Sequence, residues 1–176
     1  MIIHEGKLHL TWGTGDYEMV APLIDGNVKP EGIVLNPITL GSPERHWRMM
    51  RHHEFDVSEL SMSSYMMLAD QGSDFIAIPV FAHRRFRHSY IFVNSKQIQK
   101  PADLNGKKIG LRTFQATAGI WARGILQEEY GVDLKGVQWF TQDEDDVPFE
   151  PNPGWSVTRL PAGTNIDRML QDGELQ

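Results

Sequence analysis

In the first half of the chain, short strand-like segments alternate with segments of helical periodicity. Residues 7–12 alternate polar and apolar side chains before a glycine-rich turn, which predicts a strand. We expect a helix next, with Asp16 as its N-cap and residue 24 near its end. Further strands are expected at 32–40, 55–60, 75–81 and 89–94, and further helices at 42–53 and 63–72. This repetition favours a parallel sheet covered by helices.

Two features refine this pattern. The run at 75–81 is continuously apolar, which is typical of a strand buried on both faces. A polar segment begins near residue 95 and introduces a new unit, in which the helix expected at 116–130 has Trp121 and Ile125 on its packed face. Its other elements are a turn or short helix at 101–106, strands at 107–111, 137–140 and 156–160, and a helix from 165 onward. The predicted fold class is α/β.

Composition and charge narrow the classes of function. The 176 residues carry 17 Lys and Arg against 23 Asp and Glu, and a net charge of −6 argues against a nucleic-acid binder. The absence of cysteine excludes a disulfide framework and a thiol nucleophile. No segment approaches the ~20 apolar residues of a membrane-spanning helix, and no leader pattern opens the sequence. We therefore expect no membrane insertion and a cytoplasmic protein, or a periplasmic one if an upstream leader was missed.

Candidate ligand-binding residues lie where parallel strands are expected to end. The first turn has Glu18 where a dinucleotide-binding fingerprint needs glycine, and no P-loop or nucleophile elbow is present. In open α/β sheets, ligands bind beyond the carboxyl ends of the strands. The polar residues at such positions are Thr14, Asp16, Glu59, Ser61, Ser63, Ser64, Arg112, Gln115 and Thr117.

Several of these residues have two possible roles. The three serines either cap the helix that follows them or bind a carboxylate, and capping by one of them is expected. Glu59 either pairs with an arginine, which we favour, or transfers a proton.

The densest charge cluster is the basic loop at residues 83–88, with three arginines and two histidines. Arg84 and Arg87 suit carboxylate binding, because guanidinium groups pair with carboxylates bidentately. His88 suits proton transfer near neutral pH. The alternative is a surface turn whose charges pair with local acids.

Two other groups favour structural interpretations. His46 and His53 are about 10 Å apart along a helix, too far for joint metal ligation, so we expect a solvated or amphipathic face and no metal or cofactor. Five of the eight residues 143–150 are acidic, and we favour a solvated loop over a partner-binding segment.

Three segments resemble the 4,5-dihydroxyphthalate decarboxylase family. They are residues 55–65, residues 79–89 around Phe86-Arg87-His88-Ser89, and Trp121-Ala122-Arg123-Gly124-Ile125-Leu126. Residues 101–110 resemble the segment that opens the second lobe of many type 2 periplasmic solute-binding proteins. The chain departs from the family pattern at Ala82-His83 and at the additional Arg85.

This resemblance implies a two-lobed clasp of the type 2 periplasmic-binding-protein kind. We expect lobe one over 1–94 and lobe two over 95–176, with mixed, mostly parallel sheets. The second lobe is expected to be incomplete, because the sequence stops where another strand should follow. The chain is then either a fragment of a longer gene product or a naturally truncated chain. Exposed apolar sheet surface is expected as a result.

The resemblance also implies decarboxylation of a dihydroxylated aromatic dicarboxylate to a dihydroxybenzoate. His88 would then donate the proton, with Glu59 and Arg87 assisting and Arg84 binding a carboxylate. Ser61, Ser63, Gln115 and Thr117 would complete the clasp. The alternative is a solute-binding protein for a small anionic or aromatic ligand, with an ABC permease as partner and no catalysis. The missing leader favours the enzyme.

Overall fold

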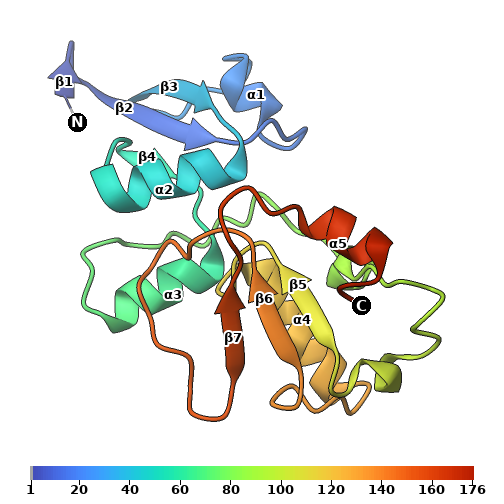
Figure 1. The fold of residues 1–176 in the computed structure, drawn as a ribbon. Coiled ribbons are helices and arrows are strands. Elements are labelled where there is room, and N and C mark those ends of the chain that lie inside the picture. Colours follow the sequence, from blue (N-terminus) through green and yellow to red (C-terminus); the bar gives the residue numbers. More distant parts are fainter. Residues whose placement is uncertain (1) are drawn as a thin grey trace.

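The computed structural model describes residues 2–176 and contains two separate sheets (Figure 1). In the first sheet, the central strand β2 (Lys7–Thr14) pairs in parallel with β3 (Ile33–Thr39) and β4 (Val57–Ser58). Strand β1 (Ile2–His4) adds an antiparallel edge. The expected mixed, mostly parallel α/β architecture is therefore confirmed.

The helices of the first sheet are α1 (Ala21–Ile24) and α2 (Ser42–His52). The helix expected from Asp16 is shorter than predicted: Asp16 is exposed, and Val20 occupies the N-cap position. The reason is that Tyr17 reaches across to Glu59 with its hydroxyl group. The segment before α1 is thus used to position a side chain.

The second sheet is entirely parallel, with strand order β5-β6-β7. Its strands and helices agree with the predicted segments to within a few residues. They are β5 (Lys108–Leu111), α4 (Thr117–Glu128), β6 (Gln138–Thr141), β7 (Ser156–Arg159) and α5 (Ile166–Asp172). The side chain of Asn165 caps α5 by accepting a hydrogen bond from the backbone N–H of Arg168 at 3.0 Å.

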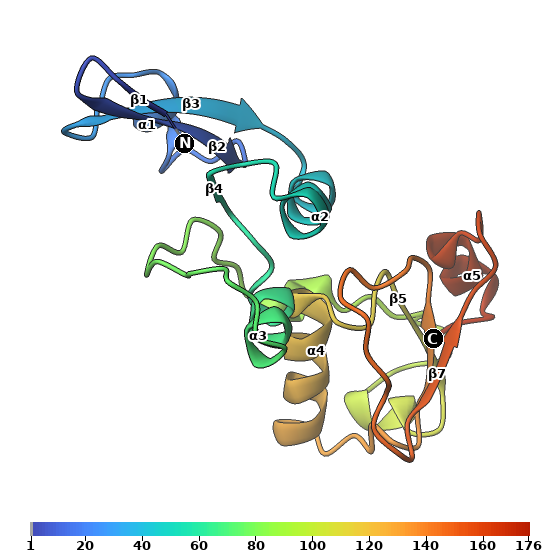
Figure 2. The ribbon, with the colours of Figure 1, turned by 90° about the vertical axis from the view of Figure 1, so that its left-hand side faces the viewer.

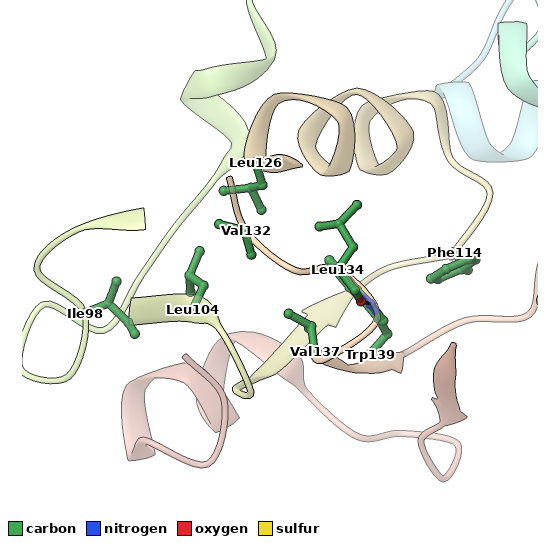
Figure 3. Packing of buried hydrophobic residues seen from close by; sticks show 8 residues of the cluster. All are labelled: Ile98, Leu104, Phe114, Leu126, Val132, Leu134, Val137 and Trp139. Carbon is green, nitrogen blue, oxygen red and sulfur yellow. Dashed lines mark hydrogen bonds between the residues drawn. The ribbon is translucent and has the colours of Figure 1, made fainter. Parts of the chain in front are cut away.

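A cluster of buried apolar residues packs around this second sheet (Figure 3). Its members are Ile98, Leu104, Phe114, Leu126, Val132, Leu134, Val137 and Trp139. The indole N–H of Trp139 donates to the Leu134 carbonyl at 2.9 Å, which satisfies the one polar atom of this ring. Leu104 enters the cluster from the short 3-10 helix η2 (Pro101–Leu104), which agrees with the expected turn or short helix.

The buried face of helix α4 agrees with the expected one only in part, since Ile125 packs inward and Trp121 does not. Its buried residues are Gly119, Arg123, Ile125 and Leu126. Trp121, which was expected to pack, is exposed. The guanidinium of Arg123 takes an interior position instead, 4.0 Å from the centre of the Phe114 ring, and donates to the Phe114 carbonyl at 2.8 Å.

Helix α3 (Met62–Asp70) lies beside α4, as both views of the ribbon show (Figures 1 and 2). The 3-10 helix η1 (Arg87–Tyr90) also contacts α4. The boundary between lobes at residue 94 stays a prediction.

The predictions of strands at 75–81 and 89–94 are wrong. Within the described residues 2–176, neither 75–81 nor 89–94 pairs with a strand, and the second begins as η1. Ile76 is 88% exposed and Phe92 is 72% exposed. Apolar composition alone does not make a strand, because its backbone groups need a neighbouring strand for hydrogen bonding.

The helices within residues 2–176 are all too short or too polar to cross a bilayer.

Candidate functional site

The turn after β2 directs Tyr17 toward the end of β4. Thr14 is buried at the end of β2, and Gly15 follows it. A Cβ atom at Gly15 would lie 2.5 Å from the Tyr17 ring, so only glycine leaves room for this ring. The Tyr17 hydroxyl donates to Glu59 at 3.2 Å.

A polar cluster surrounds this contact; it comprises the buried Arg45 and the half-buried Tyr17, His46, Glu59 and His83. Arg45 is completely buried and donates to Glu59 at 2.6 Å. It also donates to the Leu40 carbonyl after β3, and to the Tyr17 hydroxyl at 3.4 Å. The expected pairing of Glu59 with an arginine is thus present. The catalytic role of Glu59 stays a prediction.

The two imidazoles of this cluster favour their neutral forms. Burial lowers the pKa of His46 to about 4, and the charges of Arg45 and His83 act in the same direction. Burial also lowers the pKa of His83, assisted by Arg85 and opposed by Glu59. The His83 ring stacks on Tyr17 with 5.2 Å between the ring centres. Burial, followed by the charge of Glu59, raises the pKa of Tyr17.

A hydroxyl cluster follows directly in the chain and links α3 to α4; it comprises Ser61, Ser63, Ser64, Gln115 and Thr117. The Thr117 hydroxyl lies 2.9 Å from the Ser61 hydroxyl and 3.0 Å from the Ser63 hydroxyl. It also accepts the Ser63 backbone N–H at 3.2 Å. Ser64 is 3.4 Å from the Gln115 side chain. The structure therefore brings five predicted binding residues together.

The expectation that one serine caps α3 is wrong. Ser61 occupies the N-cap position, but its side chain makes no capping hydrogen bond among the described residues. The hydroxyl is instead engaged by Ser63 at 3.1 Å and by Thr117. Contact with α4 therefore replaces local capping.

His83 joins the basic loop to the polar cluster, but Arg84, Arg87 and His88 make their contacts elsewhere. Arg84 stacks over Phe81 at 5.4 Å and Arg87 over Tyr90 at 5.3 Å, each measured to the ring centre. His88 Nε2 lies 3.3 Å from a carboxylate oxygen of Glu129, just beyond the end of α4. Thr117 begins α4, so the two ends are separated by about 18 Å along the helix. The structure does not bring His88 and Glu59 together.

The two remaining predicted residues are exposed. Asp16 faces solvent, and Arg112 pairs with Asp143 at 2.7 Å. Tyr17 and Arg45 were missed as site residues, although both stand near predicted strand ends. Their positions in the sequence could have identified them. Tyr17 follows the glycine turn after β2, and Arg45 lies in the first turn of α2 after β3.

The acidic segment 143–150 is not the solvated loop that was expected. Val147 is buried, and its N–H donates to the Gln115 side chain at 3.0 Å. The Gln115 amide donates back to the Val147 carbonyl at 2.6 Å, and the Gln115 backbone N–H donates to Asp145 at 2.9 Å. This segment, which we call the acidic loop, is therefore anchored beside the hydroxyl cluster.

Among residues 2–176, no three histidine, aspartate or glutamate side chains are grouped so that they could hold a metal ion.

Known proteins of similar sequence are named 4,5-dihydroxyphthalate decarboxylase. The chain is 39% identical to one from Comamonas testosteroni over 179 residues, which cover 96% of this chain and 54% of that protein. It is 42% identical to one from Pseudomonas putida over 179 residues, which cover 96% of this chain and 69% of that protein. The chain belongs to the 4,5-dihydroxyphthalate decarboxylase family.

Residues 31–149 also match the family described as "ABC transporter, phosphonate, periplasmic substrate-binding protein". Both the predicted family and the predicted periplasmic-binding-protein fold are therefore confirmed. The chain spans 54% of the length of the Comamonas relative and 69% of the length of the Pseudomonas relative.

Proposed function

We propose that this protein decarboxylates a dihydroxylated aromatic dicarboxylate, such as 4,5-dihydroxyphthalate, to a dihydroxybenzoate. The observation that carries this proposal is the identity of 39% and 42% to two proteins named for this reaction, over 96% of the chain. The substrate is a small aromatic dianion, and no cofactor is part of the proposal.

The chemistry makes three demands on the protein. The ring carbon that bears the departing carboxylate takes up a proton, and the electrons of the broken carbon–carbon bond return to the ring as CO2 leaves. Cationic groups must hold the carboxylates, polar groups must hold the ring hydroxyls, and an acid must reach the ring carbon. Guanidinium groups such as those of Arg84, Arg87 and Arg112 suit the first demand.

Support for the location of the site comes from the two adjoining clusters. Glu59 ends one cluster and Ser61 begins the other, at the carboxyl end of β4. Carboxyl ends of parallel strands are where open α/β sheets bind ligands. Thr117 and Gln115 bring groups from the second lobe to the same place.

Two imidazoles are candidates for the proton donor. The sequence pattern points to His88, which stays a proposal. His83 is a second candidate because its ring stacks on Tyr17 and its pKa responds to the charge of Glu59.

Product analysis in D2O tests this proposal. The purified protein is incubated with 4,5-dihydroxyphthalate, and NMR should show a dihydroxybenzoate with one deuterium at the vacated ring carbon. His83→Gln and His88→Gln are compared: the donor variant should lose turnover and keep substrate binding. If both variants keep full turnover, neither histidine is the donor.

Tight binding without any product would favour the other candidate function, a solute-binding protein that serves an ABC permease. The match of residues 31–149 to a transporter-associated family is the observation that favours this alternative. The expected cytoplasmic location stays a prediction that cell fractionation can test.

A further inference from the structure

Two arginines at the ends of two strands pair with the acidic loop. Arg112, directly after β5, donates to Asp143 at 2.7 Å. Arg159, the last residue of β7, lies 3.7 Å from Glu144.

These arginines converge on one edge of the second sheet. Leu111, Thr141 and Arg159 are paired across β5, β6 and β7, so Arg112 and Arg159 stand at the carboxyl ends of strands on either side of β6. A groove of about 590 Å³ opens there. Arg159 lines it together with apolar side chains such as Phe149 and Val157 and with four carboxylates, those of Asp143, Glu144, Asp145 and Glu150.

The present partners of these arginines are easily replaced. Arg112 and Arg159 are exposed, as is Glu144. Ion pairs between exposed side chains are weak and compete with water and dissolved anions. The loop itself stays in place, because Gln115 anchors it at Val147 by two hydrogen bonds. Its carboxylates therefore remain close to the arginines even when an anion takes their position.

We propose that Arg112 and Arg159 form a binding site for the carboxylates of an aromatic dicarboxylate, and that Asp143 and Glu144 compete with the ligand for these two guanidinium groups. This inference rests on the proposed function, since it assigns the substrate's carboxylates to this edge. A guanidinium binds a carboxylate bidentately, and the groove beside Arg159 has room for an aromatic ring.

Calorimetric titration of the full chain with 4,5-dihydroxyphthalate, and with phthalate as a second probe, tests the site. Arg159→Gln should weaken binding of both probes about fivefold or more. Arg159→Lys should weaken binding less, because it keeps the charge and loses the bidentate geometry. Arg168→Gln is the matched control: Arg168 is also exposed and paired with an acid, Asp172, at 3.5 Å, and binding should not change.

The competing acids give an opposite and more specific signal. The double variant Asp143→Asn, Glu144→Gln should bind both probes about threefold more tightly, since it removes the competitors and leaves the arginines free. A merely structural loop would give unchanged or weaker binding. Thermal melting of each variant identifies any that fails to fold, and Arg159→Lys then substitutes for Arg159→Gln.

The inference is overturned if neither probe binds the unchanged protein, if Arg159→Gln binds like Arg168→Gln, or if the double variant does not bind more tightly. Its failure is distinct from that of the proposed function. If the variants change binding as predicted but no product forms, the arginine site is supported and the decarboxylase proposal is rejected. If product forms but Arg159→Gln leaves the KM unchanged, the decarboxylase proposal is supported and the arginine site is rejected.

Discussion

Single residues fix the geometry of the polar cluster around Tyr17. Arg45 is completely buried, and a buried charge is tolerated only when it is paired and hydrogen bonded. Glu59 supplies the paired charge, while the Leu40 carbonyl and the Tyr17 hydroxyl accept further hydrogen bonds. Tyr17 in turn depends on Gly15, which leaves room for its ring.

Replacement of Gly15 by alanine should therefore damage the site. The new Cβ would meet the Tyr17 ring at 2.5 Å, so the ring must shift, and we expect this shift to weaken its hydrogen bond to Glu59. We expect the free energy of unfolding to fall by about 1–3 kcal/mol, measured by urea denaturation. Gly124→Ala is the control, because a Cβ at Gly124 meets none of the described atoms within 4 Å. Alanine suits its helix and should be neutral or stabilising; equal losses would contradict this account.

His46 should make stability depend on pH. Its pKa is about 4 in the folded protein and about 6.5 in the unfolded chain, so the unfolded chain binds more protons between these values. The contribution of His46 to stability is complete above pH 6.5 and is lost as the pH falls toward 4. Its loss should reach about 3 kcal/mol at most.

Urea denaturation at several values between pH 4 and 7 measures this contribution. His46→Asn should give a flatter dependence of the free energy of unfolding on pH than the unchanged protein. His52→Asn, at an exposed position on the same helix, should keep the original dependence. Identical slopes for all three proteins would contradict the assignment to His46.

At the scale of elements, the Thr117 hydroxyl makes three of the hydrogen bonds that link α3 to α4. Thr117→Val keeps the shape of the side chain and removes the partner of the Ser61 hydroxyl, the Ser63 hydroxyl and the Ser63 backbone N–H. We expect a loss of about 1–3 kcal/mol in the free energy of unfolding. Thr164→Val is the control. It removes a hydroxyl that donates to the Pro161 carbonyl in a surface turn, so the free energy of unfolding should fall by less. Equal losses would argue against the hydroxyl cluster as a link.

Most elements could be predicted because their periodicity and boundaries agree. The alternation before the glycine turn gave β2, and the apolar segments of the second half gave β5, β6 and β7. Residues 75–94 could not be predicted in this way, since a strand depends on a neighbour that a local pattern does not reveal. The buried face of α4 was predicted only in part: Ile125 is buried as expected, but Arg123 packs against aromatic rings there and Trp121 does not pack inward.

The candidate site was predictable in part. Polar residues at expected strand ends led to Glu59 and to the hydroxyl cluster, whose members do lie together. Arg45 was not found, because its burial depends on the partner across the sheet edge and not on its helix pattern. The acidic loop was expected to be solvated, and only its contacts with Gln115 reveal that it is anchored.

At the scale of the whole molecule, the chain combines two sheets with the helices that follow their strands (Figure 1). Polar side chains from both parts meet after β4 and at the start of α4. Its family and its fold are established, while its proposed reaction depends on groups from both parts of the chain. Arg45 and Glu59 belong to the first set of elements, and Gln115 and Thr117 to the second. A single assay of the reaction therefore tests the account as a whole.

That assay is the release of CO2 from 4,5-dihydroxyphthalate by the purified protein, with phthalate as the comparison substrate. Phthalate has the same two carboxylates but lacks the hydroxyls that supply electron density to the ring carbon, so it should bind and release no CO2. The account predicts CO2 release from 4,5-dihydroxyphthalate alone. Binding of both compounds with no CO2 from either would contradict the proposed decarboxylase.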